Sequence, residues 1–307
     1  MTAEVLPMLA IFAFTALAAA TPLIFVTLGE TLTQRTGVIN LGVEGEMLFG
    51  ACFGFGAAMA TGSPWLGLAA GMLAGAGLSL CHAAMVLGAQ ANQIASGLAV
   101  WILGLGVTSY AGRQFVGGQV DALPRLDLPI LRDVPLLGEG LTRAGLGAVL
   151  AVAAVLIAAW WLARTRTGLF WRSAGESAKI SRENGLNPVR ARLMSIVTGG
   201  ALAGFGGAVL SIDYTQTWAQ DMTKGQGLVA VGLVIVARWN PVLVLPVCFV
   251  FGLAQVAAVR LPAAGFELSA YVFLALPYIA VLVVIALTHA LANVRTAMPA
   301  DLRAVFR

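Results

Sequence analysis

The sequence predicts an all-α fold, a polytopic transmembrane helical bundle of about 8–10 membrane segments that include broken or re-entrant helices. Hydrophobic residues make up 59% of the chain and charged residues only 10%, which is far from the balance of soluble domains. No Asp, Glu, Lys or Arg occurs between Glu46 and Arg113. As one helix this interval would be about 100 Å long, whereas the hydrocarbon core of a bilayer is about 30 Å thick. The interval must therefore cross the membrane more than once.

Five further uncharged stretches are each long enough to form a transmembrane helix. They are residues 5–29, 144–163, 193–212, 239–259 and 268–294. Polar or helix-breaking residues at 61–64 and 88–93 divide the long interval after Glu46 into three more segments. A last apolar stretch, residues 225–237, has only about 13 residues and is predicted to be a half-helix or a re-entrant segment.

The Lys and Arg residues orient the predicted bundle. Loop 164–192 has a large excess of Lys and Arg over acidic residues, so we expect it to be cytoplasmic. Loop 113–143 balances its arginines with as many acidic residues and contains three prolines, so we expect it to be extracytoplasmic. Alternating crossings then place the C-terminus in the cytoplasm and the N-terminus outside. The whole chain, residues 1–307, is predicted to form one transmembrane domain.

The basic loop is predicted to contain a short cytoplasmic helix over residues 174–184. Ser173 and Glu176 form an S-x-x-E capping box, and Gly185 suits the left-handed end of a helix. Asn187 followed by proline is typical of the start of the next helix. A helix exposed between two spans is well placed to receive force from a partner protein, and the alternative is a solvated connector. The candidate coupling residues are Ser173, Gly175, Glu176, Lys179, Arg182, Glu183, Gly185 and Asn187.

A second candidate site is the segment of residues 36–46, where glycines, an amide and two carboxylates precede an apolar run. We expect a broken helix there. Ionisable groups at membrane depth are costly and usually face a cavity, a partner or a pathway. The alternative is that Glu44 and Glu46 cap the start of their own helix at the cytoplasmic interface. Residues 213–224 are either another end of the pathway or an ordinary loop. The candidate pathway or gate residues are Asn40, Glu44, Glu46, Asn92, Gln93 and Gln226.

Glycine patterns predict how the helices pack and hint at an internal repeat. Residues 37–43 resemble residues 227–233, and residues 71–77 resemble residues 200–206, although the order of the two motifs is swapped. Small residues at four-residue spacing let helices approach closely, and the alternative is chance, because the chain has 36 glycines. The spaced sets are Gly50 and Gly54; Gly67, Gly71 and Gly75; and Gly200 and Gly204.

Several classes of function are disfavoured. The sequence has no phosphate-binding loop, no H-E-x-x-H and no G-x-S-x-G, so we predict no catalytic residue, metal or cofactor in this chain. Its three cysteines lie in apolar segments, and its basic residues lack the aromatic interleaving of nucleic-acid-binding proteins. A self-sufficient secondary transporter or channel would need ion-coupling groups, and the deep candidates beside the two glutamates are His82 and His289. Both histidines are predicted to be packed and neutral.

Three parts of the sequence resemble a known family. Residues 36–48, residues 172–187, and residues 200–204 together with residues 237–241 resemble the permease family that serves bacterial ABC importers for simple sugars, nucleosides and branched-chain amino acids. The agreement extends over most of the chain. Asn40-Leu41-Gly42-Val43-Glu44-Gly45-Glu46-Met47 and Arg238-Trp239-Asn240-Pro241 look most like the nucleoside-type branch.

This resemblance implies a non-catalytic, multi-pass subunit of an ATP-driven importer in the bacterial inner membrane. The chain would form the pathway for nucleosides by alternating access, and residues 174–184 would be its coupling helix. ATP and Mg would bind to separate ABC ATPase subunits. The other implied partners are a second, different permease, an extracytoplasmic substrate-binding protein and the lipid bilayer, with no nucleic acid. A simple sugar such as ribose or a branched-chain amino acid is the alternative solute.

Overall fold

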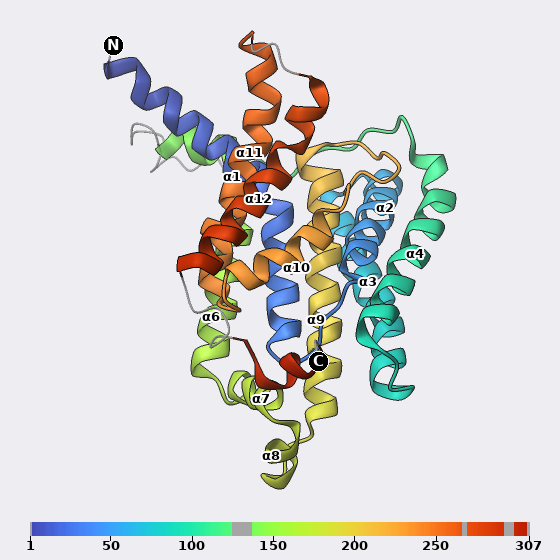
Figure 1. Cartoon of the computed structure of the whole chain (residues 1–307). Coiled ribbons are helices and arrows are strands. Elements are labelled where there is room, and N and C mark those ends of the chain that lie inside the picture. The colour runs from blue at the N-terminus through green and yellow to red at the C-terminus, as the bar shows by residue number, and fades with distance from the viewer. Residues whose placement is uncertain (1, 125–136, 266–268, 292–297, 306–307) are drawn as a thin grey trace.

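The structure, a computed structural model, describes residues 2–124, 137–265, 269–291 and 298–305 (Figure 1). Every regular element in these ranges is a helix, which confirms the predicted all-α bundle. Seven helices in the described residues are long and apolar enough to cross a membrane. They are Ala10–Gln34, Pro64–Gly88, Gln93–Phe115, Ala144–Arg164, Pro188–Tyr214, Pro241–Ala263 and Tyr271–Thr288.

Two more helices complete the predicted membrane segments. α2 carries Glu44 and Glu46 in its first turn and is not among these seven, and α10 is an apolar helix of only 11 residues. The bounds are α1 (Thr2–Gln34), α2 (Val43–Thr61), α3 (Pro64–Ala83), η1 (Ala84–Gly88), α4 (Gln93–Ala111), η2 (Gly112–Phe115), α6 (Leu137–Arg164), α7 (Arg166–Glu176), α8 (Ala178–Glu183), α9 (Pro188–Ala208), η3 (Val209–Tyr214), α10 (Gln226–Val236), α11 (Pro241–Ala263), α12 (Ala270–Leu291) and α13 (Ala300–Val305).

Both predicted breaks between α2 and α4 are present. Gly62 has a φ of +66° and ends α2, and the Ser63 hydroxyl caps α3 by accepting a hydrogen bond from the N–H of Leu66. Asn92 caps α4 by accepting a hydrogen bond from the N–H of Ile94. A left-handed glycine and side-chain caps satisfy backbone groups that helix ends leave free, so the chain reverses direction where the sequence predicts.

The centre of the bundle is a junction at which α2, α3 and α9 approach one another through glycine. A Cβ atom on Gly50 would collide with the backbone of Gly204, and a Cβ atom on Gly75 would collide with the backbone of Gly200. Gly71 lies between these pairs, and a Cβ atom there would be 2.8 Å from the carbonyl oxygen of Gly50. The four-residue spacing of small residues is therefore a helix interface, as predicted, rather than a chance pattern.

The bundle has two dissimilar ends, which we name the basic end and the pocket end (Figure 1). The basic end comprises α7, α8 and α13, and the C-terminus lies there. The pocket end comprises the turn at Gly62 and the loops of residues 116–124 and 215–221, and the N-terminus lies on this side. Between the two ends α10 runs across α1 and also contacts α2 and α12.

The helix predicted over residues 174–184 is wrong in its boundaries. α7 ends at Glu176, and α8 begins only after Ser177. The Ser177 hydroxyl caps α8 by accepting a hydrogen bond from the N–H of Ile180. Ser173 instead donates its hydroxyl to a carbonyl within α7, so the proposed capping box is absent. Both serines have the right residue type for a cap, and tertiary contacts decide between them.

The end of the basic loop follows the prediction. Gly185 has a φ of +75°, the left-handed conformation that closes a helix. The Asn187 side chain accepts hydrogen bonds from the N–H groups of Val189 and Arg190, and Pro188 is the first residue of α9. The start of α9 is therefore set by local residue types.

The loop predicted over residues 113–143 contains more helix than expected. It begins within η2, and α6 already starts at Leu137. Gly145 has a φ of +77° and a ψ of 170°, so a kink separates the first turns of α6 from the long apolar part. Residues 125–136 of the predicted loop lie outside the described residues.

Candidate translocation and coupling site

The candidate site is centred on residues 35–42, which we call the α1–α2 link. Asn40 stabilises this link through hydrogen bonds of both its backbone and its side chain. Its N–H donates to Oε1 of Glu30 over 3.1 Å, and its side-chain amide donates to Oε1 of Glu46 over 2.7 Å. Its Oδ1 accepts a hydrogen bond from the N–H of Gly42. The predicted helix break is therefore present, and buried polar groups stabilise it.

Two carboxyl groups are buried beside the link. Glu30 is 1% exposed and Glu46 is fully buried. Glu30 also accepts a hydrogen bond from the amide of Gln34, whose oxygen accepts one from the indole N–H of Trp239. Oε2 of Glu46 has no hydrogen-bond partner among the described residues. Unpaired buried oxygens are rare in folded proteins, so Glu46 stays a candidate for a functional position.

Glu30 was missed in the sequence, because the first span was expected to end at Gly29. α1 instead continues to Gln34, so that Glu30 lies inside the bundle. The signal that was available is the spacing of Glu30 and Gln34, which lie on one helical face and interact there.

Glu44 joins α2 to the short helix α10. Its carboxylate accepts hydrogen bonds from the hydroxyl of Thr223 and from the N–H groups of Gly225 and Gly227. The start of a helix has free N–H groups and a favourable dipole for negative charge, so a carboxylate suits this position. Glu44 and Glu46 both lie in the first turn of α2, where the helix dipole favours negative charge, but neither caps α2 through a hydrogen bond, and Glu44 instead caps α10.

The other predicted pathway residues are only partly brought together. Gln226 is the first residue of α10 and is 9% exposed, next to the groups that bind Glu44. Gln93 accepts a hydrogen bond from the N–H of Ile39 in the α1–α2 link over 2.9 Å. Asn92 is exposed and serves as the cap of α4, so the structure does not bring it to the buried cluster.

His82 was predicted to be a packed residue, and it is fully buried in α3. Its ring nitrogens lie 3.1 Å from the hydroxyl of Ser96 and 3.2 Å from the carbonyl oxygen of Ile39. These contacts tie α3 and α4 to the α1–α2 link. The side chain of His289 lies outside the described part of the chain.

The predicted coupling residues lie on the surface of the basic end. Ser173, Gly175 and Glu176 are in α7, Lys179, Arg182 and Glu183 are in α8, and Gly185 and Asn187 lie between α8 and α9. Ser173 is partly buried and Gly175 is buried, and the other six residues are exposed. The apolar side chains of Ile180 and Leu186 are also exposed beside them, by 59% and 38%. Exposed apolar side chains within a charged surface are typical of a protein contact.

Gly175 is the point at which α7 touches the α1–α2 link. A Cβ atom on Gly175 would collide with the backbone carbonyl of Arg35 and would lie 3.2 Å from the nitrogen of Gly37. Only glycine allows this approach of two backbones. α7 and the α1–α2 link are therefore in direct backbone contact.

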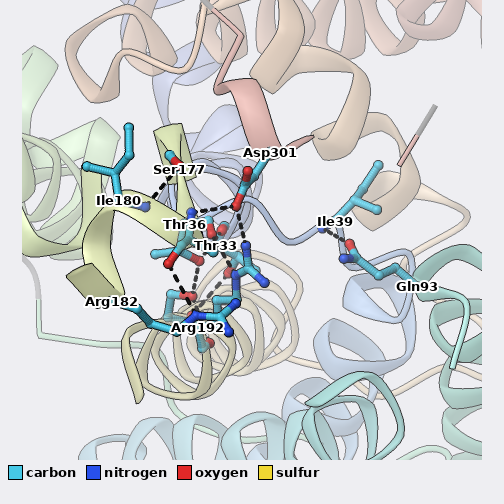
Figure 2. Close-up of polar contacts among 11 residues, drawn as sticks. Thr33, Thr36, Ile39, Gln93, Ser177, Ile180, Arg182, Arg192 and Asp301 are labelled. Atoms are coloured by element: carbon cyan, nitrogen blue, oxygen red, sulfur yellow. Dashed lines mark hydrogen bonds and ion pairs between the residues drawn. The ribbon is translucent and has the colours of Figure 1, made fainter. Parts of the chain in front are cut away.

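Asp301 of α13 fastens the basic end, and the sequence pattern did not reveal it. Figure 2 shows this carboxylate between the guanidinium of Arg192 and the start of α8. Its Oδ2 accepts hydrogen bonds from Arg192 over 2.7 Å and from the N–H of Ala178 over 3.1 Å. Arg192 also donates to the carbonyl of Thr36 over 3.2 Å. Asp301 and Arg192 together thus connect α13, α8, α9 and the α1–α2 link.

The pocket end contains an open pocket of ≈ 380 Å³. Its lining comes from three segments: Ala58, Met59, Gly62 and Pro64; Gln119, Val120 and Asp121; and Thr215, Gln216 and Thr217. Asp213 of η3 connects two of these segments, because its Oδ1 accepts a hydrogen bond from the N–H of Leu123 over 3.2 Å. Amide, hydroxyl and carboxylate groups around an open pocket suit a ligand with hydrogen-bonding groups.

Comparison with known proteins identifies the family of this chain. The family described as branched-chain amino acid transport system / permease component matches residues 12–285. The chain belongs to this family. The protein is thus a permease component of an ABC transporter, a membrane subunit with several apolar helices. No solved structure matches the permease.

Three relatives of the permease have been given transport roles. A Haloferax volcanii protein, whose name provisionally makes it a glucose ABC transporter permease, is 36% identical over 79% of this chain and 75% of its own. The guanosine ABC transporter permease of Bacillus subtilis is 34% identical over 82% of this chain and 83% of its own. A nucleoside ABC transporter permease of Lactococcus lactis is 29% identical over 83% of this chain and 86% of its own.

Proposed function

We propose that this permease forms the translocation pathway of an ATP-driven importer for nucleosides and works by alternating access. α7 and α8 receive the movement of a separate ATPase subunit that binds ATP and Mg. The contact between Gly175 and the backbone of Arg35 carries the proposal. In this contact α7 lies directly on the link that contains Asn40 and leads to Glu44 and Glu46.

α10 and Glu44 are the proposed gate. α10 is too short to cross a bilayer, and short or interrupted helices in transporters often line the solute pathway. Its first turn is held by the carboxylate of Glu44, which lies in the first turn of α2. A shift of the α1–α2 link moves that turn, so the hold on α10 changes between the two states of the transporter.

The contact at α10 also supports an uncharged solute. In some transporters the N-terminus of a half-helix binds an anionic group of the solute. Here Glu44 already occupies this N-terminus, so a carboxylate of an amino acid has no such site at α10. This argument favours a nucleoside or a sugar over a branched-chain amino acid.

The relatives support a nucleoside as the first candidate and a sugar as the second. The guanosine and nucleoside permeases are 34% and 29% identical to this chain. The relative provisionally named for glucose is 36% identical, which is the reason to keep a sugar as the second candidate.

The proposed complex contains ABC ATPase subunits, a second and different permease, and an extracytoplasmic substrate-binding protein in the bacterial inner membrane. Its basic end faces the cytoplasm together with the C-terminus, because loops rich in Lys and Arg stay on that side. α7 and α8 are then on the side where ATP is hydrolysed.

Uptake of labelled guanosine tests the proposed function in cells that produce the chain with its transporter partners. We expect unlabelled nucleosides to compete, whereas glucose and leucine do not. Replacing residues 177–187 by a Gly/Ser linker of equal length should abolish uptake, since it removes α8 while the membrane helices remain. Competition by glucose would indicate that the solute is a sugar rather than a nucleoside. Unchanged uptake with the linker would contradict the proposed coupling role of α8.

A further inference from the structure

The turn between α10 and α11 has an unusual backbone. Arg238 and Trp239 have φ values of 52° and 53°, in the left-handed region that residues with a side chain rarely adopt. Trp239 is 2% exposed, and its backbone N–H donates to the carbonyl oxygen of Val234 in the last turn of α10. Such a conformation persists only where its surroundings hold it, and it often marks a functional position.

The end of α1 holds this turn through two adjacent residues. Nε of Arg35 donates to the carbonyl oxygen of Trp239 over 2.6 Å. The indole N–H of Trp239 donates to Oε1 of Gln34 over 2.7 Å. The backbone and the side chain of the same strained residue are therefore both bound to α1. A movement at the end of α1 must be followed by the turn.

Arg35 also faces α7 on its other side. Its backbone carbonyl is in contact with Gly175. Burial lowers the pKa of Arg35 below its ordinary value, the nearby carboxylate of Glu176 acts in the opposite direction, and Arg172 lowers the pKa further. The buried Gly175 and the exposed Glu176, two neighbouring residues of α7, thus lie next to the residue that holds the turn.

We propose that Arg35 is a positioning residue that transmits the movement of α7 to α10. This inference rests on the proposed coupling role of α7 and α8. α10 is held at both ends, by Glu44 at its start and by Arg35 through Trp239 at its end. Arg35 thus gives α7 a route to α10 that does not depend on a change in α2.

The matched variants Arg35→Met and Arg35→Gln separate this role from general packing. Methionine has similar length and no donor, whereas glutamine places an amide nitrogen at the position of Nε. Both are measured in proteoliposomes that contain the full transporter, as solute taken up per ATP hydrolysed. We expect Arg35→Met to lower this ratio about tenfold, the loss of one charged hydrogen bond, and Arg35→Gln to restore most of it.

A purely structural role predicts a different pattern. It would lower the yield of assembled transporter in Arg35→Met while the uptake per ATP of the recovered complex stayed normal. That result would overturn the proposal, as would equal losses in both variants. Arg113→Met, at an exposed residue of η2, is the control and should leave the ratio unchanged.

Trp239→Phe provides a second, independent variant should Arg35→Met fail to assemble. It keeps an aromatic ring but removes the bond to Gln34, and we expect about a threefold loss of uptake per ATP. An unchanged ratio would contradict the proposal. If the wild-type complex shows no ATP-dependent uptake, the proposed function fails, and this outcome is distinct from a failure of Arg35 alone.

Discussion

The basic end and the pocket end of this permease are built in opposite ways. At the basic end, Asp301 and Arg192 connect α8, α9, α13 and the α1–α2 link through hydrogen bonds. At the pocket end, Asp213 ties one loop to η3, while the polar side chains around the pocket stay exposed. This difference suits the proposed roles, in which the basic end receives the movement of the ATPase and the pocket end admits the solute.

The two ends share the glycine junction of α2, α3 and α9. The helix backbones touch there, so a larger residue at the junction would separate them. In the proposed mechanism this junction connects the movement of the two ends. The following substitutions test the comparison, beginning with the shared junction.

Gly75→Leu should have the largest effect, since it separates the helices on which both ends depend. Its side chain would collide with the backbones of Gly200 and Gly204, which cannot retreat alone. We expect the free energy of unfolding to fall by about 3 kcal/mol or more, seen as a lower Tm in detergent micelles. Gly77→Leu in the same helix is the control, because no atom lies within 4 Å of a Cβ there. Equal Tm values would contradict the close junction.

Asp301→Ala should have an intermediate effect that is confined to the basic end. It removes the acceptor for Arg192 and for the N–H of Ala178. The ion pair is 22% and 31% exposed, so its loss should cost about 1 kcal/mol. We expect trypsin to cleave after the exposed Lys179 and Arg182 about fivefold faster, because α8 opens more often.

Asp213→Ala is the matched substitution at the pocket end. It should leave the rate of cleavage in α8 unchanged and speed hydrogen exchange at the N–H of Leu123, which loses its acceptor. If Asp213→Ala also accelerated cleavage in α8, the two ends would not be independent in their local stability.

Gln216→Gly should have the smallest effect. Gln216 is exposed at the pocket and has a φ of 56°, a conformation that glycine adopts without steric cost. Part of this gain is lost to the greater freedom of glycine in the unfolded chain, so we expect a stabilisation of about 0.5 kcal/mol. Thermal unfolding in micelles should show a Tm higher by about 1 °C. A lower Tm would show that the Gln216 side chain contributes to the pocket end.

The breaks between the helices and several of their caps were predictable, because they depend on neighbours in sequence. Apolar runs predicted the spans, and Gly62, Asn92, Gly185 and Asn187 predicted breaks and caps. The prediction went wrong where two local solutions were equally good. Ser173 and Ser177 both suit a cap, and Asp301, more than a hundred residues away, binds the N–H of Ala178 and thereby favours the second.

Sequence alone determined that this chain crosses a membrane many times, where it is broken, and which segment is exposed and basic. It also named Asn40, Glu44, Glu46 and Gly175 as residues of interest. Only the tertiary structure decided what they touch: the partners of Glu44 follow it by about 180 residues in the chain, and Arg35 meets Trp239 across a similar interval. Hydrophobicity and capping are properties of a segment, whereas a buried hydrogen bond depends on which segments meet.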